Sequence, residues 1–272
     1  MVKPLVSVVL ASFNESPEII SASIDSILKQ TYKDFELLIL DDSTKEGTKA
    51  AVDLFKADSR VKVFRGMERK GFVHSLNDGL KVAQGKYIAR MDGDDIALPE
   101  RLEKEISFLE AHSEIYVVGG QINLIDGAGK VISSRPYPLG GWRLWLFSAI
   151  RNPLAHPTVV LRRELVEKGF YYDETLKMSE DLDLWLRILN AGYQIANIPD
   201  TVLNYRVDND FIKKRSSRLQ KAYMAGVRKK NFDRKRFFYS SLSCVSGQIF
   251  KNTPAGIIRK IYQRENTRSE MN

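Results

Sequence analysis

A chain of 272 residues, of which 43% are hydrophobic, is long enough to bury the core of one large domain with or without an appendage. Its single cysteine, Cys244, excludes an internal disulfide and a zinc site built from cysteines. The sequence contains neither a run of about 18 apolar residues that would span a membrane nor a recognisable signal peptide, so we expect a cytoplasmic protein.

The net charge of +8 is distributed unevenly along the chain. Residues 211–272 contain sixteen Lys and Arg against three Asp and Glu, a net charge of +13, whereas residues 1–210 contain twenty-six against thirty-one, a net charge of −5. Segments of such different charge are expected to have different functions or neighbours. The sequence therefore predicts a domain over residues 1–210, followed by a basic, amphipathic helical tail over residues 211–272.

Apolar runs alternate with helical patterns through the first 100 residues. Buried strands are predicted at residues 5–12, 35–43, 61–66 and 85–89, and helices at residues 22–30, 47–58 and 73–85. This alternation is typical of a parallel sheet with helices on its faces. Ligands of such sheets bind beyond the carboxyl ends of the strands, and three strands here end in polar residues: SFNE, DDS and DGDD.

The second half of the chain is expected to be less regular. An amphipathic helix is predicted at residues 98–112, after which Pro and Gly interrupt the pattern, so we expect a mixed sheet. A further helix is predicted at residues 178–193, because its leucines and Trp185 fall on one face and Gly192 ends it.

The turn DGDD places three carboxylates, Asp92, Asp94 and Asp95, directly after a predicted strand. Asp92 and Asp94 alternate along extended backbone, so they can point to the same side. Crowded carboxylates need a cation or hydrogen-bond donors among them, and Mg²⁺ is commonly bound by one or two carboxylates together with substrate phosphates. The hypothesis for this turn is a divalent metal that carries a nucleotide diphosphate. The alternatives are a solvated turn, a helix cap at Asp95, and a calcium loop, although Ala97 stands where such a loop requires glycine.

Two further pairs of acidic residues are candidates. Asp41 and Asp42 end the second predicted strand, and a carboxylate, which only accepts hydrogen bonds, suits the N–H edge of uracil, thymine or guanine. In the segment SED, Ser179 is expected to cap a helix, and Glu180 and Asp181 lie in its first turn, where the helix dipole favours anions. Capping explains both pairs without any ligand. The functional interpretation of the second pair is that one carboxylate is a general base.

Two basic residues are further candidates for the site. Arg206 is a candidate for binding phosphate and His156 for lining an acceptor pocket, the alternatives being a solvated arginine and a packed histidine. The sequence contains no P-loop, GxGxxG, HExxH or GxSxG pattern. It therefore gives no support to ATP hydrolysis, dinucleotide redox chemistry, zinc proteolysis or serine-esterase activity.

Four segments in the order VSVVLASFNE, FELLILDDST, LNDGLKVAQGKYIARMDGDD and SEDLDLWLRI closely resemble the bacterial family 2 glycosyltransferases with a GT-A fold. The resemblance covers about residues 5–210 and is greatest to enzymes that build O-antigen, capsule and exopolysaccharide repeat units. It implies a Rossmann-like α/β domain with a mostly parallel central sheet, divided into a nucleotide-sugar-binding half (1–100) and an acceptor-binding half (101–210). It also implies an inverting, Mn²⁺- or Mg²⁺-dependent transfer from a nucleoside-diphosphate sugar, expected to be a UDP-sugar.

The resemblance assigns roles to individual residues of this chain. Asp181 would be the catalytic base, and Glu180 would help to hold the acceptor. Asp94 would bind the metal. The residues expected to bind the nucleotide sugar are Ala11, Phe13, Glu15, Asp41, Asn77, Arg90 and Asp92.

Two positions depart from the family pattern. Many members have Arg where this chain has Leu76, so Arg90, Lys70 or Arg206 is expected to supply the positive charge near the phosphate. Many members have His where this chain has Asp208, which weakens a phosphate-binding role for that loop.

The basic tail interleaves charged and aromatic residues, which favours attachment to anionic lipid at the inner face of the cell membrane. The family resemblance implies an undecaprenyl-diphosphate-linked or oligosaccharide acceptor there. A solvated appendage, a dimer contact and RNA binding are the alternatives for the tail, but no nucleic-acid partner is expected because the body lacks a recognised module. The rival functions are a sugar-1-phosphate nucleotidyltransferase and a non-catalytic, nucleotide-binding scaffold at the membrane surface. The oligomeric state is left open.

Overall fold

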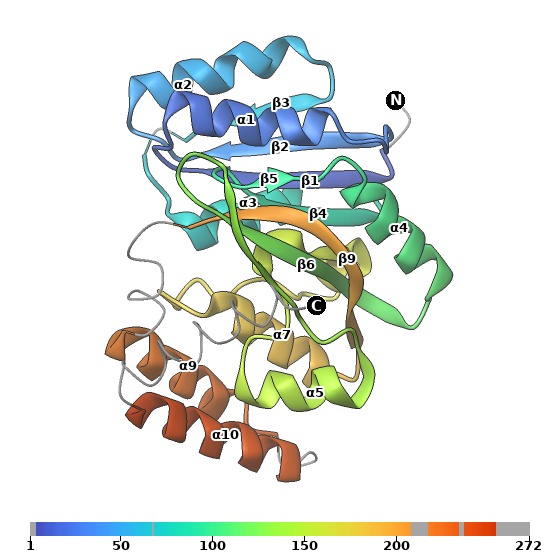
Figure 1. Ribbon diagram of the computed structural model, residues 1–272, viewed down its shortest axis with the longest axis vertical. Helices are drawn as coiled ribbons and strands as arrows, with labels where there is room; N and C mark the ends of the chain where they lie inside the picture. The colour runs from blue at the N-terminus through green and yellow to red at the C-terminus, as the bar shows by residue number, and fades with distance from the viewer. Residues whose placement is uncertain (1–3, 67, 208–216, 234–236, 254–272) are drawn as a thin grey trace.

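The computed structural model of the protein describes residues 4–66, 68–207, 217–233 and 237–253 (Figure 1). Strands and helices alternate at the beginning of the chain, as the hydrophobic pattern predicts. Their order is β1 (Val6–Ser12), α1 (Pro17–Leu28), β2 (Phe35–Asp41), α2 (Glu46–Asp53), a 3₁₀ helix (Leu54–Ala57), β3 (Val61–Phe64), α3 (Phe72–Val82) and β4 (Tyr87–Asp92).

The rest of the chain adds a less regular set of elements. They are β5 (Ile96–Ala97), α4 (Arg101–Ala111), β6 (Ile115–Ile125), β7 (Val131–Arg135), α5 (Gly141–Ile150), a 3₁₀ helix (His156–Thr158), β8 (Val160–Arg162), α6 (Arg163–Glu167), α7 (Glu180–Asn190), β9 (Gln194–Arg206), α9 (Arg218–Lys230) and α10 (Phe237–Asn252).

One mixed sheet of nine strands crosses the molecule in the order β3-β2-β1-β4-β8-β6-β9-β5, with β7 paired to β6. The first four strands of this order are parallel, whereas β8 runs antiparallel to both β4 and β6. Strands β1 and β2 are buried at every position because helices cover both of their faces. A parallel first half and a mixed second half agree with the sequence-based expectation.

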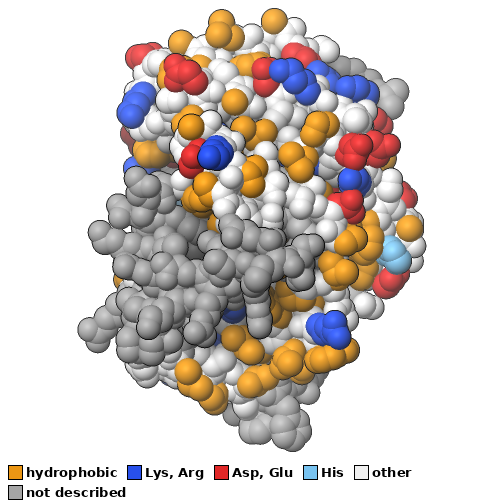
Figure 2. Space-filling view, viewed as in Figure 1, with side chains coloured by type: hydrophobic (Ala, Val, Ile, Leu, Met, Phe, Trp, Pro, Cys, Tyr) orange, Lys and Arg blue, Asp and Glu red, His pale blue; other side chains and the backbone are white. Residues whose placement is uncertain are grey.

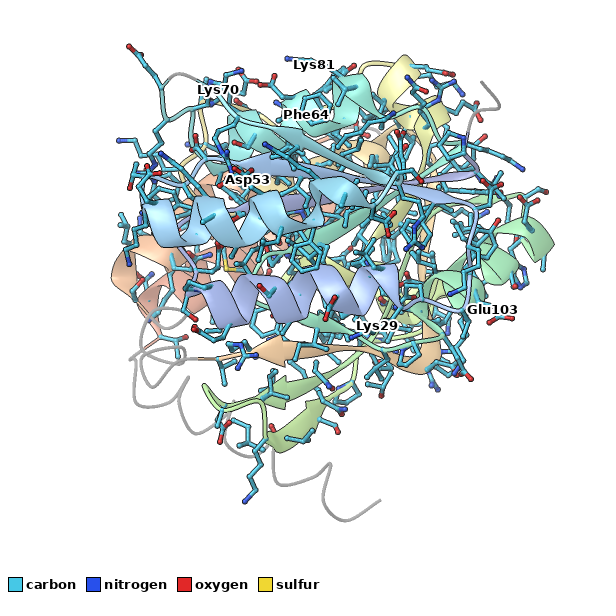
Figure 3. All side chains as sticks on the ribbon, turned by 90° about the horizontal axis from the view of Figure 1, so that it is seen from above. Lys29, Asp53, Phe64, Lys70, Lys81 and Glu103 are labelled. Carbon is cyan, nitrogen blue, oxygen red and sulfur yellow. The ribbon has the colours of Figure 1, made fainter. Side chains whose placement is uncertain are left out.

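Alternate residues of the central strands build two cores. On one face, Val8 and Leu10 of β1 pack with α1, α2 and α4. On the other face, Val9 of β1 and Leu38 of β2 pack with α3, α6 and α7. Figure 3, viewed from above, shows α1 and α2 side by side over the sheet. This two-faced packing leaves the carboxyl ends of the strands as the open edge.

The strand register brings the polar strand ends together. Ser12 at the end of β1 is paired with Asp41 of β2, and Ala11 is paired with Asp92 of β4. The segments SFNE, DDS and DGDD therefore follow neighbouring strands and lie along one rim of the sheet.

Helices α5, α9 and α10 form the end of the molecule opposite α1 and α2 (Figure 1). They join the rest through a small core that contains Ala149, Leu182, Leu186 and Val227. Buried Arg228 on α9 donates hydrogen bonds to the carbonyl oxygens of α5. Residues 211–216, 234–236 and 254–272 of the expected tail lie outside the described residues, as does Asp208 of the expected domain. Within the described ranges, no helix combines the length and apolar character needed to cross a membrane.

Candidate functional site

The turn after β4 forms an acidic cluster. Asp92, Asp94 and Asp95 each offer a carboxylate oxygen, and these oxygens lie within 4.8 Å of one another. Burial, followed by the negative charges of Asp92 and Glu15, raises the pKa of Asp94 to about 7. The crowding expected from the sequence is therefore present in the structure.

Asp95 is not the helix cap that was considered from the sequence. Helix α4 begins at Arg101 with Glu100 at the capping position, whereas Asp95 is buried and its Oδ1 accepts a hydrogen bond from the backbone N–H of Arg206 at 2.8 Å. Its Oδ2 has no hydrogen-bond partner among the described residues. A buried carboxylate oxygen without a donor is costly unless a cation completes its surroundings. The cluster thus fits a hard divalent cation such as Mg²⁺ or Mn²⁺, which takes oxygen ligands.

Arg90 forms a side-chain ion pair with this cluster. Its guanidinium donates two hydrogen bonds to the carboxylate of Asp92, one of them at 2.6 Å, and lies 5.3 Å from the ring centroid of Phe72. Of the other two cations expected near a phosphate, Lys70 pairs with Asp78 at 2.6 Å. Arg206 lies at the acidic turn, but its guanidinium donates to three backbone carbonyl oxygens, one of them that of Asp94. Arg90 is therefore the one of the three that faces the acidic cluster through a side-chain ion pair.

The turn after β1 is held rigid by its own side chains. The carboxylate of Glu15 accepts hydrogen bonds from the Phe13 backbone N–H at 2.9 Å and from Ser12 Oγ at 2.8 Å. Asn14 has a φ of 63°, a left-handed conformation that Asn tolerates, and its Oδ1 accepts from the N–H groups of two residues after β2. The Phe13 ring is 41% exposed and lies 3.9 Å from the guanidinium of Arg69. Ala11 is buried, and its carbonyl oxygen accepts from Gly93 N.

Asp41 is less accessible than its predicted role requires. Its side chain is 0% exposed, and Oδ2 accepts hydrogen bonds from Arg65 at 2.6 and 2.8 Å while Oδ1 accepts from Ser43 N. The neighbouring Asp42 accepts from the backbone N–H groups of Lys70 and Gly71. Contact between Asp41 and a base remains a prediction, since Arg65 now covers the carboxylate.

A cavity of about 450 Å³ opens beside these two aspartates. Its lining comes from the ends of β2 and β3 and from α3, and it includes Phe64, Lys70 and Lys81. Figure 3 shows these three side chains at the same edge of the molecule. This cavity lies on the predicted nucleotide-binding half.

A second cavity, of about 460 Å³, lies between the two halves of the chain. Arg90 and Asp92 of β4 line it together with Glu180 and Asp181 of α7, so segments nearly 90 positions apart in the sequence meet there. Further lining residues include three cations and four aromatic or imidazole rings, namely Arg135, Arg151, Lys177, Phe72, Tyr137, His156 and Tyr205. The structure thus brings the predicted catalytic pair next to Asp92 of the acidic cluster.

The start of α7 differs from the expected cap. Ser179 has a φ of 64° and makes no capping hydrogen bond; its Oγ instead accepts from Gln220 Nε2 of α9 at 3.2 Å. Asp181 accepts hydrogen bonds from the side-chain amide of Asn152 and from Leu182 N. Burial, and then the charge of Asp181, raises the pKa of Glu180 to about 7. A carboxyl group that titrates near neutrality, beside an oriented carboxylate, is suited to proton transfer.

The family model for "Glycosyl transferase family 2" matches residues 7–169, more than half of the chain. The chain is a family 2 glycosyltransferase. This membership favours glycosyl transfer over the nucleotidyl-transfer and scaffold alternatives.

Curated relatives of this glycosyltransferase are about one third identical to it over the aligned residues. It is 34% identical over 221 residues to the putative glycosyltransferase EpsE of Bacillus subtilis, covering 78% of this chain and 77% of EpsE. It is 34% identical over 245 residues to the O-antigen biosynthesis glycosyltransferase WbnJ of Escherichia coli, covering 89% and 94%. It is also 34% identical over 188 residues to the E. coli UDP-Glc:alpha-D-GlcNAc-diphosphoundecaprenol beta-1,3-glucosyltransferase WfgD, covering 68% and 70%.

Solved structures share the fold of this glycosyltransferase. S. aureus TarS in complex with UDP-GlcNAc superposes with a TM-score of 0.68 at 19% identity, covering 90% of this chain and 71% of that one. The mannosyltransferase PcManGT of Pyrobaculum calidifontis, in complex with GDP-Man and Mn²⁺, gives a TM-score of 0.67 at 19% identity, covering 99% and 84%. These likenesses show the GT-A fold.

Asn77 of the glycosyltransferase makes three hydrogen bonds away from the rim. Its side-chain amide donates to Tyr172 O at 3.0 Å and to Glu174 Oε1 at 2.9 Å, and its Oδ1 accepts from Tyr172 N at 3.0 Å. The expected position near the donor therefore remains a prediction, and the observed contacts tie α3 to the segment that leads into α7.

His156 both packs and lines the cavity. Its Nε2 lies 2.8 Å from the hydroxyl of Tyr172, and burial together with Arg90 lowers its pKa well below the ordinary value. The ring is therefore neutral. Tyr172, Arg65 and Asn152 were not identified from the sequence, because each acts on a partner at least 16 positions away and belongs to no recognisable motif.

Proposed function

We propose that this glycosyltransferase transfers a sugar from a UDP-sugar, with inversion, to a hydroxyl group of a saccharide carried on a lipid diphosphate. The observation that carries the proposal is the position of Asp92. It belongs to the acidic cluster suited to a metal diphosphate, and it also lines the cavity that contains Glu180 and Asp181. A donor and an acceptor bound at these two places would meet at Asp92.

The donor side of the proposal rests on the rim and the cavity beside Asp42. Phe13 offers an exposed ring for stacking on a base, and Ala11 and Glu15 shape the turn around it. Asp41, which pairs with Arg65, is the proposed acceptor for an N–H group of the base. The names of relatives give the same chemistry: WfgD is named for a UDP-Glc donor, and TarS binds UDP-GlcNAc.

The acidic cluster is the proposed cation site. Asp94 would be a direct ligand, with Asp92 and Asp95 as neighbours, and Mn²⁺ or Mg²⁺ held there would supply positive charge to the departing diphosphate. PcManGT, which shares the fold, binds Mn²⁺ in its complex. Arg90 keeps Asp92 oriented between the two sites through its paired hydrogen bonds.

Asp181 is the proposed general base. Its carboxylate takes the proton of the acceptor hydroxyl while that oxygen forms a bond to the anomeric carbon, and the bond from this carbon to the diphosphate oxygen breaks with its electron pair. Attack from the opposite face in one displacement inverts the configuration and needs no covalent intermediate. Asn152 orients Asp181, and a general base of this kind contributes about 10²–10⁴-fold in rate.

The cations of the 460 Å³ cavity support an anionic acceptor. Arg135, Arg151 and Lys177 come from three different segments and lie on the lining shared with Asp181. Guanidinium and ammonium groups bind phosphate oxygens with short, charge-assisted hydrogen bonds. WfgD is named for an acceptor that carries diphosphoundecaprenol, which is consistent with this chemistry.

A panel of nucleotide sugars, incubated with the Mn²⁺-loaded protein and a GlcNAc-diphosphate-lipid acceptor, tests the proposal. We expect one UDP-sugar to give a product whose new linkage has the anomeric configuration opposite to that of the donor, as read by NMR. Asp181→Asn should lower kcat by about 10³-fold while donor binding by calorimetry is retained. Full activity in excess chelator would reject the metal, and retention of configuration would reject the mechanism.

We further propose that the enzyme works at the inner face of the cell membrane as a peripheral protein, with residues 1–210 as the catalytic domain. The lipid carrier of the proposed acceptor and the net charge of +13 on residues 211–272 support this location.

A further inference from the structure

Helix α5 exposes an apolar stripe. Trp142, Leu146 and Ile150 recur every four residues, so they share one side of the helix, and Trp142 is 70% exposed. Leu144 and Ser148 on the other side are buried. Exposed Arg143 lies next to this stripe, with its guanidinium 5.6 Å from the Trp142 ring centroid. A soluble surface normally scatters such large apolar side chains singly.

Helix α10 exposes a second stripe at the same end of the molecule. Leu242, Val245 and Ile249 follow helical spacing, and Ile249 is 64% exposed. The exposed Lys251 lies at the end of the same helix. Figure 2 shows apolar side chains gathered at this end of the molecule, over α5.

Both helices pack against neighbouring helices, so the exposure of their stripes does not arise from helices that lack tertiary contacts. Ser246 of α10 donates a hydrogen bond to the carbonyl oxygen of Ala149 of α5. Gly247 brings α10 so close to α9 that an added Cβ would lie 3.3 Å from the backbone of Ala225. Arg228 of α9 binds the carbonyl oxygen of the same Ala149 at 3.0 Å. The three helices pack on one another, and α5 and α10 each expose an apolar stripe.

We infer that the stripes of α5 and α10 dock on the surface of an anionic phospholipid bilayer. This inference rests on the proposed function, because it names the surface on which a lipid-linked acceptor would be met. Tryptophan beside arginine is typical of the membrane–water interface, and the basic C-terminal segment complements anionic headgroups. A second copy of the chain is less suited than a bilayer to cover these stripes, because dimerisation would bring two segments of net charge +13 together.

Helices α5 and α9 also lie next to the proposed acceptor cavity. Arg151 directly follows α5, and Gln220 and Met224 belong to α9; all three line that cavity. A bilayer held against α5 and α10 would therefore present the headgroup of a lipid-linked saccharide near Asp181, while its lipid stays in the membrane.

Co-sedimentation of the 272-residue chain with vesicles tests the inference. We expect binding to vesicles of phosphatidylglycerol and phosphatidylcholine, weaker binding to phosphatidylcholine alone, and weakening by salt. The double variants Trp142→Ser/Ile150→Ser and Val245→Ser/Ile249→Ser should each bind about tenfold more weakly, since each removes two large apolar side chains. A vesicle-induced blue shift of tryptophan fluorescence should disappear in Trp142→Phe.

Leu54→Ser is the matched control, because Leu54 is 78% exposed and follows α2 at the opposite end of the molecule. It should bind vesicles like the wild type. Circular dichroism checks that every variant folds, and transfer to a water-soluble acceptor, which should be unchanged, tests the proposed function separately. Wild-type vesicle binding by both double variants would overturn the inference. A wild-type dimer that these variants convert to a monomer would assign the face to self-association instead.

Discussion

At the scale of single residues, the site depends on how its carboxylates are paired. Asp92 has a guanidinium partner, Asp181 has the amide of Asn152, and Asp41 has Arg65. One buried oxygen of Asp95, in contrast, has no hydrogen-bond partner in the described part of the chain. These different partners give chemically identical carboxylates different orientations and different tendencies to ionise. The sequence identifies which residues are acidic, but Arg65 and Asn152 come from segments distant from their partners, so their effects could not be predicted from local motifs.

Glu180 should give the enzyme a pH dependence near neutrality. Its pKa is raised to about 7 by burial and by Asp181, so its carboxyl group is protonated below that pH and ionised above it. The added negative charge strengthens Asp181 as a base, and we expect kcat to rise as the pH increases through about 7. Glu180→Gln is neutral at every pH, so its kcat profile should lack this rise. An inflection that persists at the same pH in Glu180→Gln would assign it to another group.

Asn152 should act as a positioning residue for the base. Asn152→Ala removes a hydrogen bond to the carboxylate of Asp181, and a bond to a charged group contributes about 1.5–3 kcal/mol, so kcat should fall about tenfold to hundredfold. The KM for the donor should stay unchanged because Asn152 lies on the other cavity. Asn190→Ala, at the far end of α7, is the control and should retain wild-type kcat. Equal kcat for the two variants would remove Asn152 from the mechanism.

At the scale of elements, the first half of the fold follows directly from hydrophobic periodicity. The apolar runs at 5–12 and 35–43 became β1 and β2, because strands covered on both faces have no polar alternation. Pro and Gly were expected to interrupt the regular pattern after residue 112, yet Gly141–Ile150 form helix α5, since packing against α10 and α9 outweighs the weak local signals of this segment. Ser179 was expected to cap α7, but its left-handed backbone and its contact with α9 depend on tertiary packing.

Helix α3 should tolerate no side chain at Gly79. A Cβ there would lie 2.4 Å from Cγ1 of Val9 on β1, so Gly79→Ala must push α3 from the sheet and should lower the free energy of unfolding by about 1–3 kcal/mol. Gly226→Ala on α9 is the matched control: nothing lies within 4 Å of its Cβ, and it should raise stability by up to about 1 kcal/mol. Urea unfolding at equal m-value measures both. Equal destabilisation by the two substitutions would contradict the close packing of α3.

At the scale of the whole molecule, the sequence predicts the rim but not the second cavity. The carboxyl ends of parallel strands lie at the same edge of a sheet, so SFNE, DDS and DGDD are expected there from the sequence alone. The meeting of β4 with the start of α7 instead requires β8 to insert between β4 and β6, an arrangement of distant segments that leaves no periodic signal. The resemblance to a family, rather than periodicity, therefore indicated the proposed role of Asp181.

A divalent cation should stabilise the whole fold. Mn²⁺ at about 100 times its dissociation constant contributes about 2.7 kcal/mol, so Tm should rise by about 5 °C or more, and chelator should reverse the rise. Asp94→Asn should lose this shift, yet it should not be less stable than wild type in chelator, because it removes repulsion within the cluster. Asp34→Asn, on an exposed loop residue, should keep the full shift. A Mn²⁺ response that survives in Asp94→Asn would place the ion elsewhere.

The three hydrogen bonds of Asn77 have a consequence for protein engineering. They fasten α3, in the proposed donor half, to residues 172–174, a few residues before α7, which carries the proposed base. Chimeras that exchange the second halves of related enzymes would lose these hydrogen bonds unless Asn77 and the 172–174 segment come from the same parent enzyme. A crossover chosen by sequence alignment alone would thus misalign Asp181 with its donor, even when every residue that touches substrate is retained.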